Sequence, residues 1–162
     1  MPKTHFEELQ IPNSTLRPTV VPNIRYRNIT KEVERAVAFA NVAEGVVVIQ
    51  TKHTTTAIIV NEYETGLIEG DLPRLLTKLI SERTYEHDRA ERILELGPDE
   101  PKNAPSHLRS ILVGRGKCSA TLVIHNSSIQ LGTWQAVLFF DLDPDNHPGR
   151  QVVIQVMDRA QE

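Results

Sequence analysis

The chain has 162 residues, of which 40% are hydrophobic and 24% charged, and 18 basic against 21 acidic side chains give a formal net charge of −3. This composition is ordinary for a globular domain and excludes a disordered chain, while the near-neutral charge argues against nucleic-acid binding, which needs clustered positive charge. A single cysteine, Cys118, excludes an internal disulfide framework and a multi-cysteine zinc site. Because domains typically have about 100–200 residues, we expect a single domain over residues 1–162.

The sequence contains no membrane or export signal that we recognise. Residues 1–10 have no apolar run and do not resemble a signal peptide. The longest apolar stretches, residues 45–49 and 57–60, are much shorter than the about 20 residues that cross a bilayer. We therefore predict a cytoplasmic protein that has no membrane partner.

The first part of the chain predicts strands around one helix. A helix should begin at Thr30, a typical N-cap residue followed by Glu32 and Glu34 in the first turn, and should end before Gly45. β-Branched residues predict strands on both sides of this helix. The expected segments are a strand over 4–11, an irregular link over 12–22, a short strand over 24–27, and strands over 46–50 and 56–61.

The second part predicts helices followed by three strands. A helical pattern covers residues 66–82, and because Pro73 fits only a first turn, the helix should begin near Asp71. Leu108, Ile111 and Leu112 are expected to face inward on a later helix that starts at Asn103 or Ser106 and ends at Gly114. The remaining segments are an irregular stretch over 84–105 with a short helix at 89–96, strands over 120–125, 135–142 and 151–157, and a turn cluster over 143–149.

This order of elements does not alternate strand and helix as a parallel-sheet protein would. It favours an α+β fold with a mostly antiparallel sheet and three to four helices.

His53 lies among four threonines, between two predicted strands. One interpretation is a polar hairpin, because threonine favours strands. The other is an anion or metal site at the end of a strand. If the two strands form a hairpin, Glu62 at the end of the second strand would meet His53 at the hairpin base.

Two further histidines flank the irregular segment. Asp88 follows His87 directly and could fix the tautomer of its imidazole, although a solvated loop histidine is the simpler interpretation. His107 lies near a predicted helix start, where the helix dipole lowers the pKa of an imidazole and keeps it neutral. A neutral imidazole suits metal ligation or hydrogen bonding, and the alternative is a simple capping region.

Together, His53, His87, His107 and Glu62 could form a three-histidine or a histidine–glutamate site, although no fixed metal-ligand spacing supports it. The other histidines, His5, His125 and His147, are interpreted as surface or turn residues. Cys118 is interpreted as a structural thiol. Trp134, the only tryptophan, is either a core residue or the wall of a pocket with Gln135 as a polar group beside it.

Five segments in this order and spacing resemble the YjbQ family, often labelled secondary thiamine-phosphate synthase. They are HTTTA at 53–57, NE at 61–62, YEH at 85–87, NAPSHL at 103–108 and LGTWQ at 131–135. The resemblance covers nearly the whole chain, and LGTWQ is its most specific segment.

The resemblance implies a YjbQ-like α+β fold that forms a homotrimer, with a polar site near the subunit boundaries. It also implies a weak activity that joins hydroxymethylpyrimidine diphosphate to thiazole phosphate and releases pyrophosphate. The expected catalytic residues are His53, Glu62, His87 and His107; the expected substrate-binding residues are Lys52, Asn103, Arg109, Thr133 and Gln135. A divalent metal, Mg²⁺ or Zn²⁺, would be held by His53, His87 and His107.

Three functions remain open at this point. The first is an enzyme acting on a small phosphorylated metabolite, with His87 or His107 as acid, base or ligand. The second is a trimer that binds a phosphorylated metabolite or a metal without turnover. The third is a structural trimer whose histidines satisfy hydrogen bonds at subunit interfaces. The sequence has no Asp-rich Mg²⁺ motif, which favours slow catalysis or a different main reaction.

Overall fold

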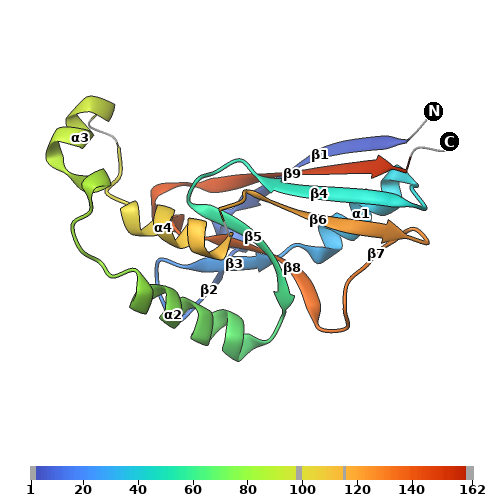
Figure 1. The fold of residues 1–162 in the computed structure, drawn as a ribbon, viewed down its shortest axis with the longest axis horizontal. Coiled ribbons are helices and arrows are strands. Elements are labelled where there is room, and N and C mark those ends of the chain that lie inside the picture. Colours follow the sequence, from blue (N-terminus) through green and yellow to red (C-terminus); the bar gives the residue numbers. More distant parts are fainter. Residues whose placement is uncertain (1–2, 98–99, 115, 160–162) are drawn as a thin grey trace.

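The computed structural model describes residues 3–97, 100–114 and 116–159. Two antiparallel sheets and the helices around them form its framework (Figure 1). The first sheet has the order β1-β9-β4-β6-β7, with β1 (Thr4–Pro12), β9 (Gly149–Asp158), β4 (Gly45–Thr51), β6 (Ser119–His125) and β7 (Ser128–Ile129). The second has the order β2-β3-β8-β5, with β2 (Arg17–Pro18), β3 (Arg25–Asn28), β8 (Gln135–Asp141) and β5 (Thr56–Glu62).

The helices of the described residues are α1 (Thr30–Ala40), α2 (Leu72–Leu79), α3 (Ala90–Leu96) and α4 (Ala104–Val113). A π-helical turn, η2 (Gly66–Asp71), runs directly into α2, and short 3₁₀ turns occur at η1 (Asn13–Thr15), η3 (Glu86–Asp88) and η4 (Pro144–Asn146). The predicted α+β class with antiparallel pairing is therefore confirmed. None of the helices in the described ranges is long and apolar enough to cross a membrane.

Strand β8 lies at the centre of the fold because both of its faces are covered. Val137 and Phe139 face α1 and the first sheet, in one hydrophobic core. Leu138 and Phe140 face the opposite way, in a second core shared with Ile68 of η2 and Leu76 of α2. A strand covered on both faces reads as a continuous apolar run, as residues 136–140 do.

Helix α1 begins where it was predicted, but its cap is different. Ile29, not Thr30, occupies the N-cap position. The side-chain oxygen of Asn28 accepts the Thr30 amide at 3.0 Å. The Thr30 hydroxyl instead accepts the Val137 amide of β8 at 2.9 Å, which ties the start of the helix to the second sheet.

Helix α2 begins at Leu72, as predicted, but an unpredicted π-helical turn precedes it. Helical structure starts at Gly66 rather than near Asp71, because the Glu64 carboxylate accepts the amides of Gly66 and Leu67, both at 2.8 Å. Pro73 lies in the first turn of α2, as expected, and is buried.

Helix α4 presents the opposite face to the one predicted. Leu108, Ile111 and Leu112 were expected to face inward, but they are 36%, 57% and 50% exposed. The face turned toward the body of the protein carries smaller and polar residues, namely Ala104, Pro105, Ser106 and Arg109. An apolar stripe is therefore exposed along α4.

Candidate functional site

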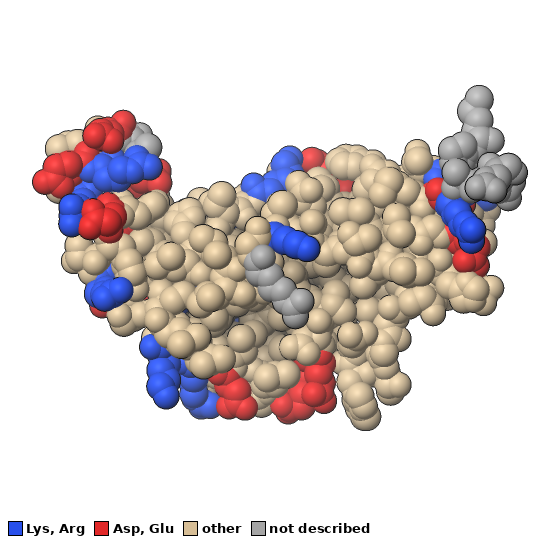
Figure 2. Space-filling view, viewed as in Figure 1, with Lys and Arg blue, Asp and Glu red and all other residues tan. Residues whose placement is uncertain are grey.

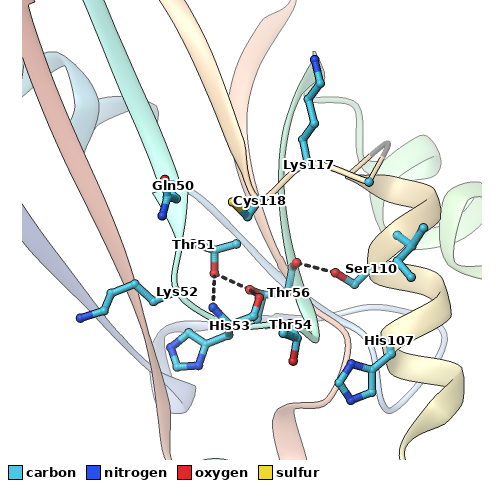
Figure 3. Close-up of a pocket in the computed structure, with 12 residues that line it drawn as sticks. Gln50, Thr51, Lys52, His53, Thr54, Thr56, His107, Ser110, Lys117 and Cys118 are labelled. Carbon is cyan, nitrogen blue, oxygen red and sulfur yellow. Dashed lines mark hydrogen bonds between the residues drawn. The ribbon is translucent and has the colours of Figure 1, made fainter. Parts of the chain in front are cut away.

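A cavity of about 510 Å³ lies between the loop that joins β4 to β5 and the side of α4 that carries His107, Ser110 and Ile111 (Figure 3). His53 and Thr54 line it from the loop, and His107 lines it from α4. Lys117 and Cys118, just before β6, complete its rim. Cys118, interpreted from the sequence as structural, is exposed here.

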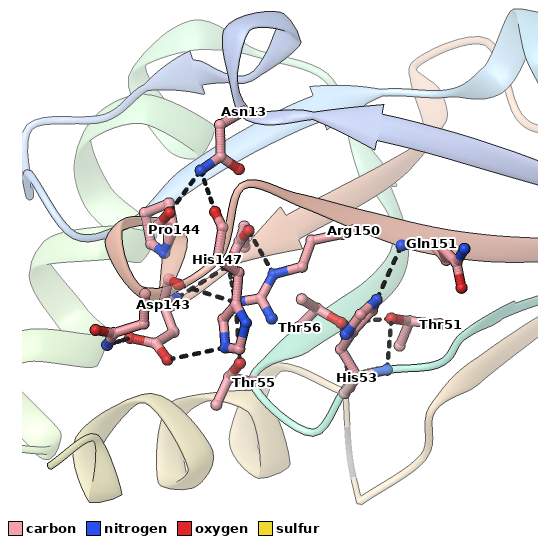
Figure 4. Close-up of polar contacts among 12 residues, drawn as sticks. Asn13, Thr51, His53, Thr55, Thr56, Asp143, Pro144, His147, Arg150 and Gln151 are labelled. Carbon is pink, nitrogen blue, oxygen red and sulfur yellow. Dashed lines mark hydrogen bonds and ion pairs between the residues drawn. The ribbon is translucent and has the colours of Figure 1, made fainter. Parts of the chain in front are cut away.

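The ring of His53 is held by the backbone of β9. The Gln151 amide donates to His53 Nε2 at 2.9 Å (Figure 4). In the neutral ring the proton must therefore be on Nδ1, which leaves Nδ1–H as a donor. Burial lowers the pKa of His53, and the positive charge of Arg150 lowers it further.

Arg150 at the start of β9 fixes the geometry around His53. This buried guanidinium donates from Nε and Nη2 to the two carboxylate oxygens of Asp141, each at 2.8 Å. Nη2 also donates to Thr55 Oγ1 at 3.1 Å and to the Asp143 carbonyl at 2.9 Å. The β4–β5 loop and the β8–β9 connection are thus joined through one side chain.

His107 and His87 lie side by side, with ring centroids 4.9 Å apart. Burial lowers the pKa of His107, with a further contribution from His87. The Asp88 carboxylate lies 2.9 Å from His87 Nδ1 and also accepts the Ala104 amide at 3.1 Å. The prediction that Asp88 orients the imidazole of His87 is consistent with this contact, which also attaches η3 to the start of α4.

Asn103 joins the two halves of this polar region. Its Nδ2 donates to Asp143 Oδ2 at 2.7 Å, and the same oxygen lies 3.7 Å from His147 Nε2. The His147 ring lies 6.5 Å from that of His53, centroid to centroid.

The sequence interpretation of His147 as a plain turn residue therefore missed a neighbour of the site, as it missed Asp141, Asp143 and Arg150. The polar turn cluster at 143–149 was the only feature of the sequence that could have pointed to these residues.

The two predicted substrate-binding cations are both paired. Lys52 lines the cavity, and its ammonium lies 3.1 Å from the Glu8 carboxylate. Arg109 is completely buried and donates to the Ile80 carbonyl at 3.1 Å and to Glu82 at 2.5 Å. Arg109 thereby connects α4 to the end of α2.

The hairpin hypothesis for His53 and Glu62 is wrong. Strands β4 and β5 belong to different sheets, where β4 pairs with β6 and β9 while β5 pairs with β8. Glu62 is at the far end of the seven-residue β5, about 20 Å from the end near His53 at about 3.3 Å per residue.

Thr133 and Gln135 are at the Glu62 end, since Gln135 is paired with Glu62 in the register of β8 and β5. The Gln135 side chain accepts the Gly132 amide at 2.8 Å and so closes its own turn. Trp134 is 74% exposed, so the core interpretation is wrong. The predicted residues are therefore divided between two ends of the second sheet.

We tested whether the residues fit the predicted metal. Within residues 3–97, 100–114 and 116–159, no group of three or more His, Cys, Asp or Glu side chains is arranged to hold an ion. His53 Nε2 already accepts the Gln151 amide. The three imidazoles do not form a ready metal centre among the described residues.

Comparison with known proteins identifies similar sequences. A family model described as "UPF0047 protein YjbQ-like" matches residues 18–159. A UPF0047 protein of Archaeoglobus fulgidus is 34% identical over 131 residues, which cover 80% of this chain and 89% of that protein. The UPF0047 protein YugU of Bacillus subtilis is 28% identical over 116 residues, covering 72% of this chain and 78% of that protein.

Solved structures share the fold. A YbjQ-like protein of unknown function from Sulfolobus solfataricus superposes with a TM-score of 0.78 at 23% identity, over 98% of this chain and 100% of that chain. An uncharacterised protein of the YjbQ/UPF0047 family from Clostridium acetobutylicum gives 0.69 at 25% identity, over 94% and 98%.

Proposed function

The chain belongs to the YjbQ (UPF0047) family, and from that membership we propose that it is an enzyme of the thiamine-phosphate synthase type, a transferase with slow turnover. The observation that carries the proposal is the pair His53 and His107, which line one cavity from opposite sides (Figure 3). Both have a lowered pKa, so both rings are neutral near pH 7. Neutral imidazoles suit proton transfer and hydrogen bonding to a phosphorylated substrate.

In this reaction a C–N bond forms between the thiazole nitrogen and the pyrimidine methylene carbon, while the C–O bond to the diphosphate breaks. Negative charge grows on the leaving diphosphate, and His53 Nδ1–H and the Lys117 ammonium are the donors that would stabilise it. His107, backed by His87 and Asp88, is the group that would exchange a proton with the departing oxygen.

The alternative is a protein that binds the same phosphorylated metabolite without turnover. One observation favours it: Lys52 and Arg109, which were expected to bind the leaving group, are paired with Glu8 and Glu82. Of the two lysines that line the cavity, Lys52 contacts Glu8, so less positive charge faces a diphosphate than the sequence predicted, which is also a reason to expect slow catalysis.

We propose a homotrimer as the working form. The exposed stripe Leu108, Ile111 and Leu112 on α4 supports self-association, because monomers rarely expose contiguous apolar patches. Charged side chains in Figure 2 lie mainly around α3, along the upper and lower edges and at the end opposite α3, and few occupy the middle of this face. A cytoplasmic location is part of the same proposal, since the exposed Cys118 thiol suits a reducing compartment.

The test is turnover of the two thiamine precursors with Mg²⁺ by wild type, His107→Gln and His125→Gln. We expect His107→Gln to lose about 100-fold in rate, as is typical for loss of a general acid–base group. His125 is exposed and pairs with Glu44 far from the cavity, so its variant should keep the wild-type rate. Wild-type turnover no faster than the uncatalysed rate, combined with precursor binding that needs His107, would support the binding protein instead.

The metal prediction is tested separately by elemental analysis of the purified protein. Mg²⁺ or Zn²⁺ binding at His53, His87 and His107 is still a proposal, although these side chains are not arranged as a metal centre in the described residues. Protein that contains neither ion, and whose turnover is unchanged by a chelator, would exclude a metal role.

A further inference from the structure

A second groove lies at the opposite end of β5 from the histidine cavity. It has a volume of about 820 Å³ and is bounded by the first turns of α1 and by the residues around the start of β8. Lys31 and Arg35 line it from α1, and Tyr63 and Trp134 line it from the other side. The segment between β7 and β8 projects from the lower edge of the molecule here (Figure 1).

The tryptophan in this groove is exposed yet held on a fixed turn. Trp134 is 74% exposed, and Tyr63 is 40% exposed. The Gln135 amide donates to the Gly132 carbonyl at 2.9 Å, and the Gly132 amide donates back to the Gln135 side chain at 2.8 Å. The Tyr63 amide donates to the Trp134 carbonyl at 3.0 Å, so the turn is also fixed to the end of β5. A large exposed aromatic on such a turn is preorganised for contact with a ligand.

The α1 wall supplies two basic side chains that form no ion pair with the residues the structure describes. Lys31 and Arg35 are exposed, lie one turn apart on the same helix face, and form no ion pair among the described residues. Arg27, by contrast, is paired with Glu32. Glu34 also lines the groove, so an anionic group would have to bind on the Lys31–Arg35 side.

We propose that this groove binds a small molecule that combines a planar aromatic ring with a phosphate, such as a nucleoside monophosphate. The ring stacks on the Trp134 indole, since every flat base has a π-face suited to an aromatic side chain. The phosphate pairs with Lys31 and Arg35, as a charge-assisted contact. Thr133 and Gln135, which the family resemblance assigns to substrate binding, also line this groove, but the groove and the histidine cavity are at different ends of the second sheet, so the two sites can be tested separately.

The test uses the fact that Trp134 is the only tryptophan, so fluorescence excited selectively at tryptophan, and not at the three tyrosines, reports on this groove. The probe is adenosine 5′-monophosphate, with adenosine and inorganic phosphate as separate titrations. We expect saturable quenching by the monophosphate, weaker quenching by adenosine, and none by phosphate.

Calorimetry on variants then assigns the contacts. Trp134→Ala should weaken monophosphate binding about ten-fold or more, and Trp134→Phe should restore most of the loss. The double variant Lys31→Ala, Arg35→Ala should remove the preference for the monophosphate over adenosine. Matched controls are Phe39→Ala, an exposed aromatic at the other end of α1, and Arg74→Ala, an exposed arginine on α2.

Three results would overturn the proposal. Absence of saturable quenching would exclude this ligand class. Equal effects of the groove and control variants would show non-specific binding. A fluorescence change that follows protein concentration without ligand would show that Trp134 is covered by a second copy of the chain instead.

Discussion

Arg150 is the side chain on which both loops around His53 depend, because it contacts Asp141, Thr55 and the Asp143 carbonyl at once. Replacing it with Met would leave the buried Asp141 carboxylate without its counter-ion. We expect Arg150→Met to lower the free energy of unfolding by about 3–5 kcal/mol. Denaturant unfolding followed by circular dichroism measures this loss.

The control for Arg150 is Arg74→Met, which removes an exposed arginine 3.8 Å from Asp71. Exposed pairs contribute about 0–1 kcal/mol, so this change should be small. Equal losses in the two variants would contradict the structural role of Arg150.

Acid should destabilise the protein through His53 and His107. Burial is the main cause that lowers the pKa of each imidazole below its ordinary value of 6.5 in the folded state. The unfolded chain therefore takes up more protons as the pH falls below about 6.5, and the free energy of unfolding falls with it. Protonation of His53 Nε2 would also break its bond with the Gln151 amide.

The measurement is unfolding between about pH 7.5 and about pH 5.5, the range in which histidine titrates. The double variant His53→Gln, His107→Gln should show a shallower dependence on pH than wild type. His5→Gln, which removes an imidazole outside the cavity, is measured for comparison. A double variant as acid-sensitive as wild type would assign the effect to other groups.

Some of the site residues could be predicted from the sequence and others could not. His53, His87 and His107 were found because a histidine among threonines, beside an aspartate or at a helix start has a recognisable local pattern. Arg150 and His147 were not found, because their roles come from a contact between two loops that are about 90 residues apart in the chain.

At the level of elements, β4 and β9 approach so closely at Gly45 that no side chain fits there. A Cβ on Gly45 would lie 2.1 Å from the Met157 carbonyl oxygen. We expect Gly45→Ala to cost at least about 1–3 kcal/mol of unfolding free energy, because the backbone of β9 would have to move. Thermal unfolding of the variant measures this cost.

Gly70→Ala is the matched control, because the nearest atom to its added Cβ is the mobile end of the Arg74 side chain at 3.1 Å. Gly70 lies in a helical segment, where alanine is favoured, so this variant should be as stable as wild type or more stable. If Gly45→Ala were equally harmless, the close approach of β4 and β9 would be in doubt.

Most elements followed from local patterns, but their partners did not. The runs at 46–50 and 56–61 were predicted as strands and are strands, yet they belong to two sheets. Helix α4 was placed correctly, while its buried face was inverted. Both errors arise because sheet membership and helix orientation depend on distant packing, which a local period does not encode.

At the level of the whole molecule, the exposed stripe on α4 bears on assembly. We expect Ile111→Glu to shift the protein from the proposed trimer to monomer, because a buried unpaired charge would oppose association. Sedimentation velocity measures the change. Leu94→Glu on α3, where the leucine is even more exposed than Ile111, is the control, and dissociation by both variants would argue against a specific role for α4.

The pairing of β1 with β9 has a consequence for how the chain is made. Thr4 of β1 is opposite Met157 of β9, and the pairing continues through Pro12 and Gly149. Strand β9 also forms the neighbour of β4, so it is an interior strand of the first sheet. Since β9 is synthesised after β1 and β4, a nascent chain holds these two strands without the strand that lies between them. The first sheet is therefore completed only after residues 149–158 leave the ribosomal tunnel, and until then β1 and β4 each lack one pairing partner.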